Sequence, residues 1–115
     1  MHVALPDKRR LYMAFLLFYV THPDEETARR IAGEVVQMRL AACANIFPVG
    51  SAYWWQGAVQ QENEWVSILK TRLELEQELE AAIRELHPYD VPCILRHEVH
   101  ANADYEHWIT TATQP

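Results

Sequence analysis

The 115-residue sequence has few of the residues from which common catalytic and phosphate-binding motifs are built. It contains only three glycines and two cysteines. A glycine-rich phosphate loop is therefore excluded, and no Gly-x-Gly-x-x-Gly, P-loop or Gly-x-Ser-x-Gly pattern occurs. The cysteines form no Cys-x-x-Cys pair, so no standard zinc module is expected. The sequence thus predicts a protein that is not an enzyme.

Positive charge is also scarce. The formal net charge is -6, and the one basic cluster is Lys8 to Arg10. A nucleic-acid binder needs a larger basic surface for phosphates, so that class is excluded. The apolar run that follows is too short to span a bilayer, and no small-residue cleavage site precedes "THPDEE". We expect a cytoplasmic protein with reduced thiols and without a membrane span.

Half of the residues are hydrophobic, which suits one globular domain. We expect an N-terminal extension over residues 1–12 and a single domain over residues 13–115. Residues 14–20 are apolar without alternation, as in a strand buried on both faces. Pro23 and the acids Asp24 to Glu26 then predict the start of a helix that ends near residues 38–40.

The rest of the chain predicts three further strands, a second long helix and a short C-terminal helix. A strand is expected over residues 41–59, with a bulge or bend at Pro48 and Gly50 and a turn at Gly57. A further strand covers residues 64–71. Thr71 and Glu74 have capping-box spacing and predict the start of a helix that ends before Pro88. A strand over residues 93–99 and a short C-terminal helix over residues 101–112 complete the order.

This order predicts an α+β fold of the ferredoxin-like, split βαβ type. Two helices would cover one face of a four-stranded antiparallel sheet, with an extra C-terminal helix. The first and third strands carry apolar residues on both faces. We therefore expect another subunit to cover the second face.

The segment "LHPYDVPCI", residues 86–94, joins the last long helix to the last strand. Its prolines make a rigid connection, and Asp90 can accept a local backbone hydrogen bond. His87 and Tyr89 are either part of this architecture or members of a site, because rigid loops are where sites are placed.

Metal ligands are the first candidate chemistry. His87, Cys43 and Cys93 carry imidazole and thiol groups, which are good ligands for copper and zinc. Their spacing matches no standard module, so a site between subunits stays open beside one within a chain. The alternative for Cys43 is a small buried hydrophobic residue.

A ligand cleft between subunits is the second candidate. Glu64 and Lys70 lie on one face of the third predicted strand, and a Lys70–carboxylate pair in such a cleft is one hypothesis. The other candidates for this cleft are Tyr89 and the aromatic residues Tyr53, Trp55 and Trp108. The alternative for the tryptophans is a role as core and interface anchors.

Several short motifs, in this order, carry a resemblance to a known family. They are "THPDEETARRIA", "RLAACANI", "YWWQG", "ILKT", "LHPYDVPCI" and "YEHW". Together they resemble the CutA divalent-cation-tolerance family from about Val20 to Trp108. The resemblance implies a ferredoxin-like domain, a PII-like homotrimer, a link to tolerance of metals such as copper, and no established catalytic activity.

The sequence departs from the family pattern at two positions. Cys93 stands where the family usually has an acid, and Ala101 replaces a glycine. The first change either removes an oxygen ligand or swaps it for a thiolate, which suits copper(I) or zinc.

Two functional hypotheses follow. The first is a trimeric, non-enzymatic protein that binds a divalent metal ion such as copper or zinc. The second is a PII-like signalling module that binds a small anion in an intersubunit cleft, facing Lys70, His87 and Tyr89. Two weaker alternatives are an enzyme that uses His87 as acid or base, and a structural scaffold.

Overall fold

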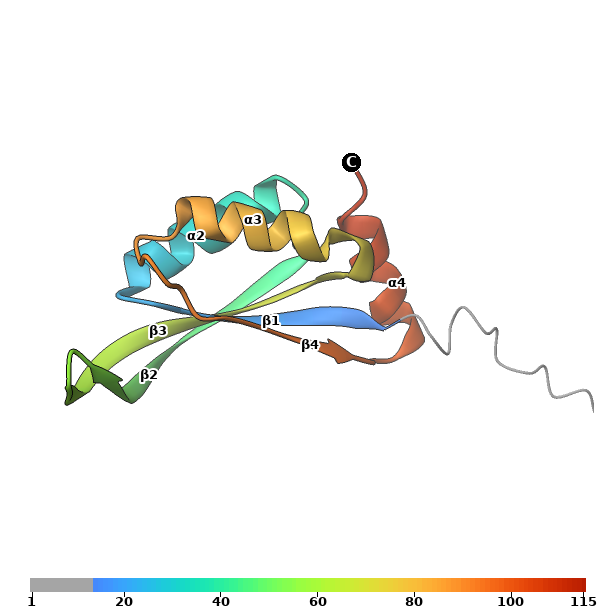
Figure 1. Cartoon of the computed structure of the whole chain (residues 1–115). Coiled ribbons are helices and arrows are strands. Elements are labelled where there is room, and N and C mark those ends of the chain that lie inside the picture. Colours follow the sequence, from blue (N-terminus) through green and yellow to red (C-terminus); the bar gives the residue numbers. More distant parts are fainter. Residues whose placement is uncertain (1–13) are drawn as a thin grey trace, which may run out of the picture.

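The computed structural model describes residues 14–115 (Figure 1). The expected extension over residues 1–12 lies outside this part of the chain. The strands are β1 (Phe15–His22), β2 (Cys43–Trp55), β3 (Ala58–Arg72) and β4 (Ile94–Val99). The helices are α2 (Glu25–Gln37), α3 (Glu76–Leu86) and α4 (Ala103–Ala112), with a 3-10 turn at Leu73–Leu75. No helix of this part is long and apolar enough to cross a membrane.

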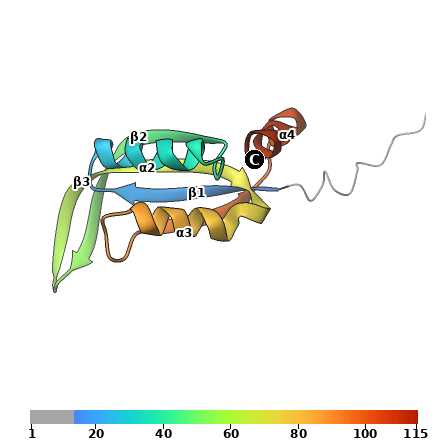
Figure 2. The same ribbon diagram turned by 90° about the horizontal axis from the view of Figure 1, so that it is seen from above.

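The strands form one antiparallel sheet in the order β2-β3-β1-β4. Helices α2 and α3 lie side by side over one face of this sheet (Figures 1 and 2). The predicted ferredoxin-like, α+β architecture is therefore confirmed.

The hydrophobic core lies between the sheet and these two helices. Alternate residues of β1 point into it, because successive strand side chains face opposite sides of a sheet. The fully or nearly buried members of the core are Leu16, Phe18, Val20, Ile31, Ala32, Val35, Ala41, Leu69, Leu79 and Ile83.

Helix α4 packs on the other face, at one end of the sheet. Its Tyr105 meets Phe15 edge to face, with ring centroids 6.2 Å apart. The β1–β3 register places Phe15 on the side opposite Leu16, whose side chain is in the core. No other helix within residues 14–115 covers the rest of that face.

Helix α2 begins as the sequence predicts. Asp24 is its N-cap and accepts a 2.8 Å hydrogen bond from the Thr27 backbone N–H. The capping-box prediction for Thr71 and Glu74 is wrong. Thr71 is paired with Leu16 in the sheet, which holds it extended, and its buried hydroxyl has no hydrogen-bond partner within residues 14–115. A 3-10 turn leads into α3 instead.

Strands β2 and β3 form a long hairpin. Gln56 and Gly57 have φ angles of 51° and 79°, as in the two-residue turns whose twist matches that of the strands. The register runs unbroken from Cys43↔Lys70 to Trp55↔Ala58, so no residue is bulged at Pro48 or Gly50. The hairpin instead curves away from the body of the domain as a whole (Figure 2).

We predict opposite effects for alanine at two glycines with open space around them. Gly57→Ala should lower the free energy of unfolding by about 1 kcal/mol, because an L-residue is strained at positive φ. Gly33→Ala, within α2, should raise it by roughly 0.5–1 kcal/mol. Urea unfolding at one protein concentration tests this, and effects of the same sign would contradict the turn geometry.

Candidate functional site

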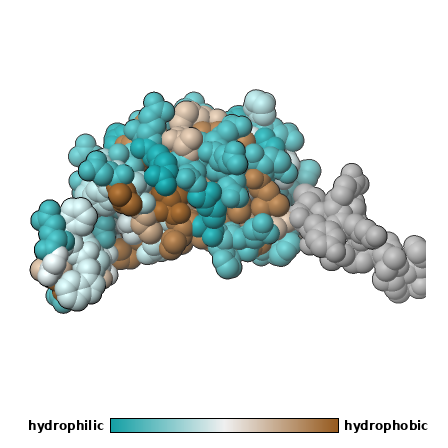
Figure 3. All heavy atoms as spheres, in the orientation of Figure 1, coloured by the Kyte–Doolittle hydropathy of each residue, from teal (hydrophilic) through white to brown (hydrophobic). Residues whose placement is uncertain are grey.

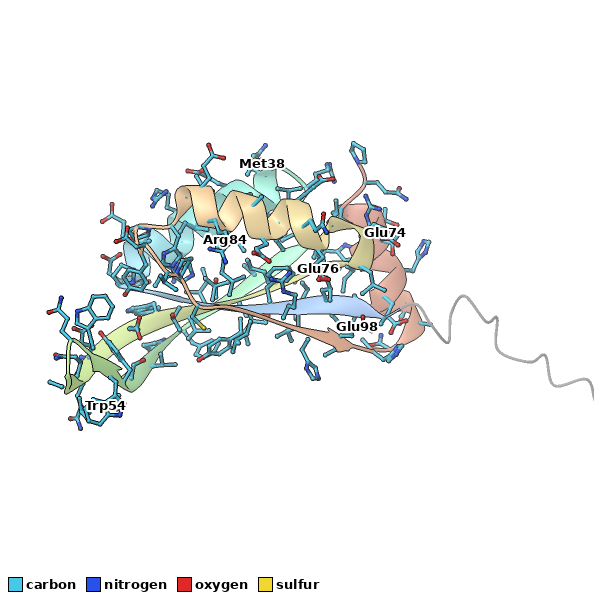
Figure 4. The ribbon with its side chains drawn as sticks, viewed as in Figure 1. Met38, Trp54, Glu74, Glu76, Arg84 and Glu98 are labelled. Carbon is cyan, nitrogen blue, oxygen red and sulfur yellow. The ribbon has the colours of Figure 1, made fainter. Side chains whose placement is uncertain are left out.

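A cleft of about 840 Å³ lies between the hairpin and the loop that follows α3. It brings together five of the candidate site residues from the sequence, namely Tyr53, Trp55, Glu64, Tyr89 and Cys93. Its other lining residues are Thr21, Gly50, Ser51, Ala52, Glu62, Pro88, Asp90 and Val91. Figure 4 shows the neighbouring Trp54 at the outer end of the hairpin.

Two tyrosine–glutamate pairs form part of the cleft wall. Tyr89 Oη donates to Glu64 at 3.1 Å, and Tyr53 Oη donates to Glu62 at 2.8 Å. Burial, followed by the bond to Glu64, raises the pKa of Tyr89, and the bond to Glu62 raises the pKa of Tyr53. Both phenols therefore stay protonated and act as donors to the carboxylates.

The cleft is acidic. Glu62, Glu64 and Asp90 line it, and none of its described lining residues is a lysine, arginine or histidine. Glu64 is only 7% exposed. Glu64 forms no ion pair within the described part of the chain. A buried carboxylate without a paired cation is costly, so this arrangement favours a positively charged ligand.

His87 lies behind the cleft wall and is largely buried. Its Nε2–H donates to the Thr21 carbonyl at 2.7 Å, and its Nδ1 accepts the Tyr89 backbone N–H at 3.1 Å. A carbonyl only accepts and a backbone N–H only donates, so this assigns the neutral Nε2–H tautomer. Both nitrogens are engaged, and in this arrangement His87 positions Tyr89 and offers no lone pair to a metal.

His22 is the buried residue that sequence reasoning missed. Its Nε2 lies 2.8 Å from Ser67 Oγ, and its ring stacks on His87 with centroids 5.2 Å apart. Its Nδ1 has no hydrogen-bond partner among the described residues. Burial, and then His87, lowers its pKa to about 4. The available signal is the two-residue period of strand side chains: if the predicted strand continues to residue 22, His22 shares the core-facing side with Leu16, Phe18 and Val20.

The remaining candidates gather at the other end of the sheet, beside α4. Cys43 pairs with Lys70 across β2 and β3. Lys70 Nζ donates to Tyr105 Oη at 3.2 Å, and Cys43 Sγ lies 3.5 Å from the same oxygen. Trp108 stacks at a tilt against Tyr105, 5.6 Å between centroids. Lys70 therefore does not line the cleft with Glu64, and Tyr105 is a member of this cluster that the sequence did not reveal.

The predicted metal set is not assembled within one chain. Cys93 lines the cleft, Cys43 contacts Tyr105, and both are free thiols. Within residues 14–115, no group of three histidine, cysteine, aspartate or glutamate residues is arranged to hold a metal ion. A complete site would need ligands from a second molecule.

The fold and the site define a class: a small split βαβ domain with an acidic, aromatic-lined cleft at one end of its sheet. Comparison with known proteins then gives the family. The CutA1 divalent ion tolerance protein family matches residues 16–112. A CutA divalent-cation tolerance protein of Pyrococcus horikoshii is 42% identical over 100 residues, which cover 86% of this chain and 98% of that protein. The chain belongs to the CutA1 family, as the motifs predicted.

Solved structures agree with this assignment. CutA1 of Ehrlichia chaffeensis is similar with a TM-score of 0.86 and 34% identity, covering 90% of this chain and 98% of that one. A CutA of Archaeoglobus fulgidus, described as periplasmic, has a TM-score of 0.84 and 34% identity, covering 87% and 99%. The fold of residues 14–115 is thus that of the family.

Acid should destabilise the protein through His22. Its folded-state pKa of about 4 lies below the ordinary 6.5, so its contribution to stability is present above pH 6.5 and is lost as the pH falls toward 4. The loss amounts to up to about 3 kcal/mol. We expect urea unfolding across this range to show a shallower pH dependence in His22→Gln than in the wild type.

The exposed His97 supplies the matched control for this measurement. His97→Gln should keep the wild-type pH dependence. If His22→Gln also keeps it, the neutral buried state of His22 is wrong.

Proposed function

We propose that the protein is a non-enzymatic, cytoplasmic homotrimer that binds a divalent metal ion, copper or zinc, and so contributes to the metal tolerance for which its family is named. One observation carries this proposal: the cleft gathers three carboxylates and the Cys93 thiol without a basic residue among its described lining. Such a surface attracts cations, and the thiol prefers soft or borderline metals.

Cys93 is the proposed protein ligand that distinguishes metals. Oxygen ligands alone suit hard cations, whereas a thiolate adds affinity for copper or zinc. Of the set expected from the sequence, Cys43 lies outside the cleft and would contribute only from a neighbouring subunit. His87 serves in this proposal as a support for Tyr89.

The uncovered surfaces support an oligomer. Leu95 in β4 is 58% exposed, and Val59 in β3 is 55% exposed. Figure 3 shows, in one view, brown apolar atoms below the largely hydrophilic helical layer. Apolar surfaces of this kind are typical of protein interfaces. The stoichiometry of three is what the family resemblance implies.

The structure offers no support for the anion-binding alternative. Lys70, the cation expected to meet the anion, donates to Tyr105 at the far end of the sheet. The enzyme hypothesis is weakened in the same way, because both nitrogens of His87 are engaged and its pKa is lowered, mainly by burial. We therefore retain only the metal-binding proposal.

Native mass spectrometry of untagged, reduced protein with copper or zinc added tests this function. We expect trimers with metal in a fixed ratio, and Cys93→Ser should weaken metal binding by at least about tenfold. Cys43→Ser is the matched control, because its thiol lies beside Tyr105. Loss of metal in both variants would identify Cys43 of a neighbouring subunit as one of the ligands that complete the site. A monomer, or unchanged metal binding in Cys93→Ser, would contradict the proposal.

A further inference from the structure

The cleft is much larger than a metal ion needs. A volume of about 840 Å³ falls within the range of pockets for small organic molecules, roughly 300–1,000 Å³. One water molecule occupies only about 30 Å³ of liquid. A metal ion held by Cys93 would therefore leave most of the space unexplained.

Three aromatic rings line the cleft, beside the apolar residues Ala52, Pro88 and Val91. Tyr53 and Trp55 come from β2, and Tyr89 comes from the loop after α3. The faces of tryptophan and tyrosine rings attract organic cations, and they also pack against methylene groups. Contact with these three rings alone would not select one amine over another.

The separation of two carboxylates sets the distance between positive groups that a ligand of this cleft would need. Glu62 and Glu64 are two residues apart on β3, so they lie on the same side of the strand at a separation of roughly 7 Å. Each accepts a hydrogen bond from one tyrosine of the wall, which fixes its orientation. Neither forms an ion pair with any residue of the described chain. Two oriented, unpaired carboxylates at this separation match a ligand with two positive groups.

The geometry points to a binding site for an aliphatic diamine, with one ammonium group on Glu64, the other on Glu62, and the methylene chain against Trp55 and the tyrosine rings. This inference rests on the cleft of the proposed function and names a second class of cation for it. A neutral or anionic compound of the same length lacks the charges that the carboxylates require. A divalent metal at the same carboxylates would compete with the diamine.

Calorimetric titration with putrescine tests the inference, with butanediol and succinate as neutral and anionic compounds of equal chain length. We expect putrescine to bind, added salt to weaken it, and the other two to show no binding. Glu64→Gln should weaken putrescine binding at least tenfold, the loss of a charge-assisted contact. Binding of succinate or butanediol as tight as that of putrescine would overturn the inference.

Two neighbouring tryptophans give a matched pair for the aromatic wall. Trp55 lines the cleft, whereas the adjacent Trp54 does not and is 74% exposed. Trp55→Leu should weaken putrescine binding severalfold, and Trp54→Leu should leave it unchanged. Glu62→Gln, at an exposed position, provides a second charge variant in case Glu64→Gln does not fold. Unchanged binding in Trp55→Leu and in the folded glutamate variants would also overturn the inference.

Failure of this inference is distinguishable from failure of the proposed function. Cys93→Ser should weaken metal binding by at least about tenfold and leave putrescine binding intact. If metal binds and putrescine does not, the metal proposal stands and the diamine inference is wrong. If putrescine binds and metal does not, the reverse holds.

Discussion

The geometry of the cleft depends on the two hydrogen bonds made by His87. One bond holds the ring to the carbonyl of Thr21 at the end of β1, and the other holds the backbone of Tyr89. The His87 backbone N–H also caps α3 through Ile83, and Pro88 keeps His87 in extended geometry. The end of a strand, the end of a helix and the start of the loop are thus joined through one residue.

The same bonds explain why the cleft contains oriented carboxylates. Because Tyr89 is held at its backbone and against the His87 ring, 4.8 Å between centroids, its hydroxyl reaches Glu64. His22 stacks on the far side of His87 and keeps the pair out of water. Burial of both imidazoles favours their neutral forms, in which His87 can accept and donate at once. The acidic wall of the cleft is therefore positioned by a pair of neutral, buried histidines.

Much of the fold could be predicted because its signals are local. The helix start at Asp24, the helix end before Pro88 and the turn at Gly57 each follow from one or two residues with restricted backbone preferences. The failure at Thr71 has the opposite origin. A capping box competes with strand pairing there, and pairing with Leu16 across the sheet is a long-range contact that sequence spacing does not show.

The candidate site could be predicted only in part for the same reason. Tyr53, Trp55, Glu64, Tyr89 and Cys93 share one cleft within a single chain. The sequence pattern instead predicted a cleft between subunits for the first four and a metal set for Cys93. Glu64 and Lys70 share a strand face in the sequence pattern, but β3 is long enough to carry them to opposite ends of the sheet. Lys70 meets Tyr105 of α4, whose packing position follows from tertiary contacts rather than from a motif.

The protonation state of His87 tests this account most directly. Nitrogen-15 NMR of the histidine rings at neutral pH should show His87 as the Nε2–H tautomer, with a slowly exchanging ring proton and an unprotonated Nδ1. Addition of zinc should leave these signals in place, because neither nitrogen is free to bind. An imidazolium, the Nδ1–H tautomer, or a His87 signal that moves with stoichiometric zinc would contradict the central role assigned to this residue.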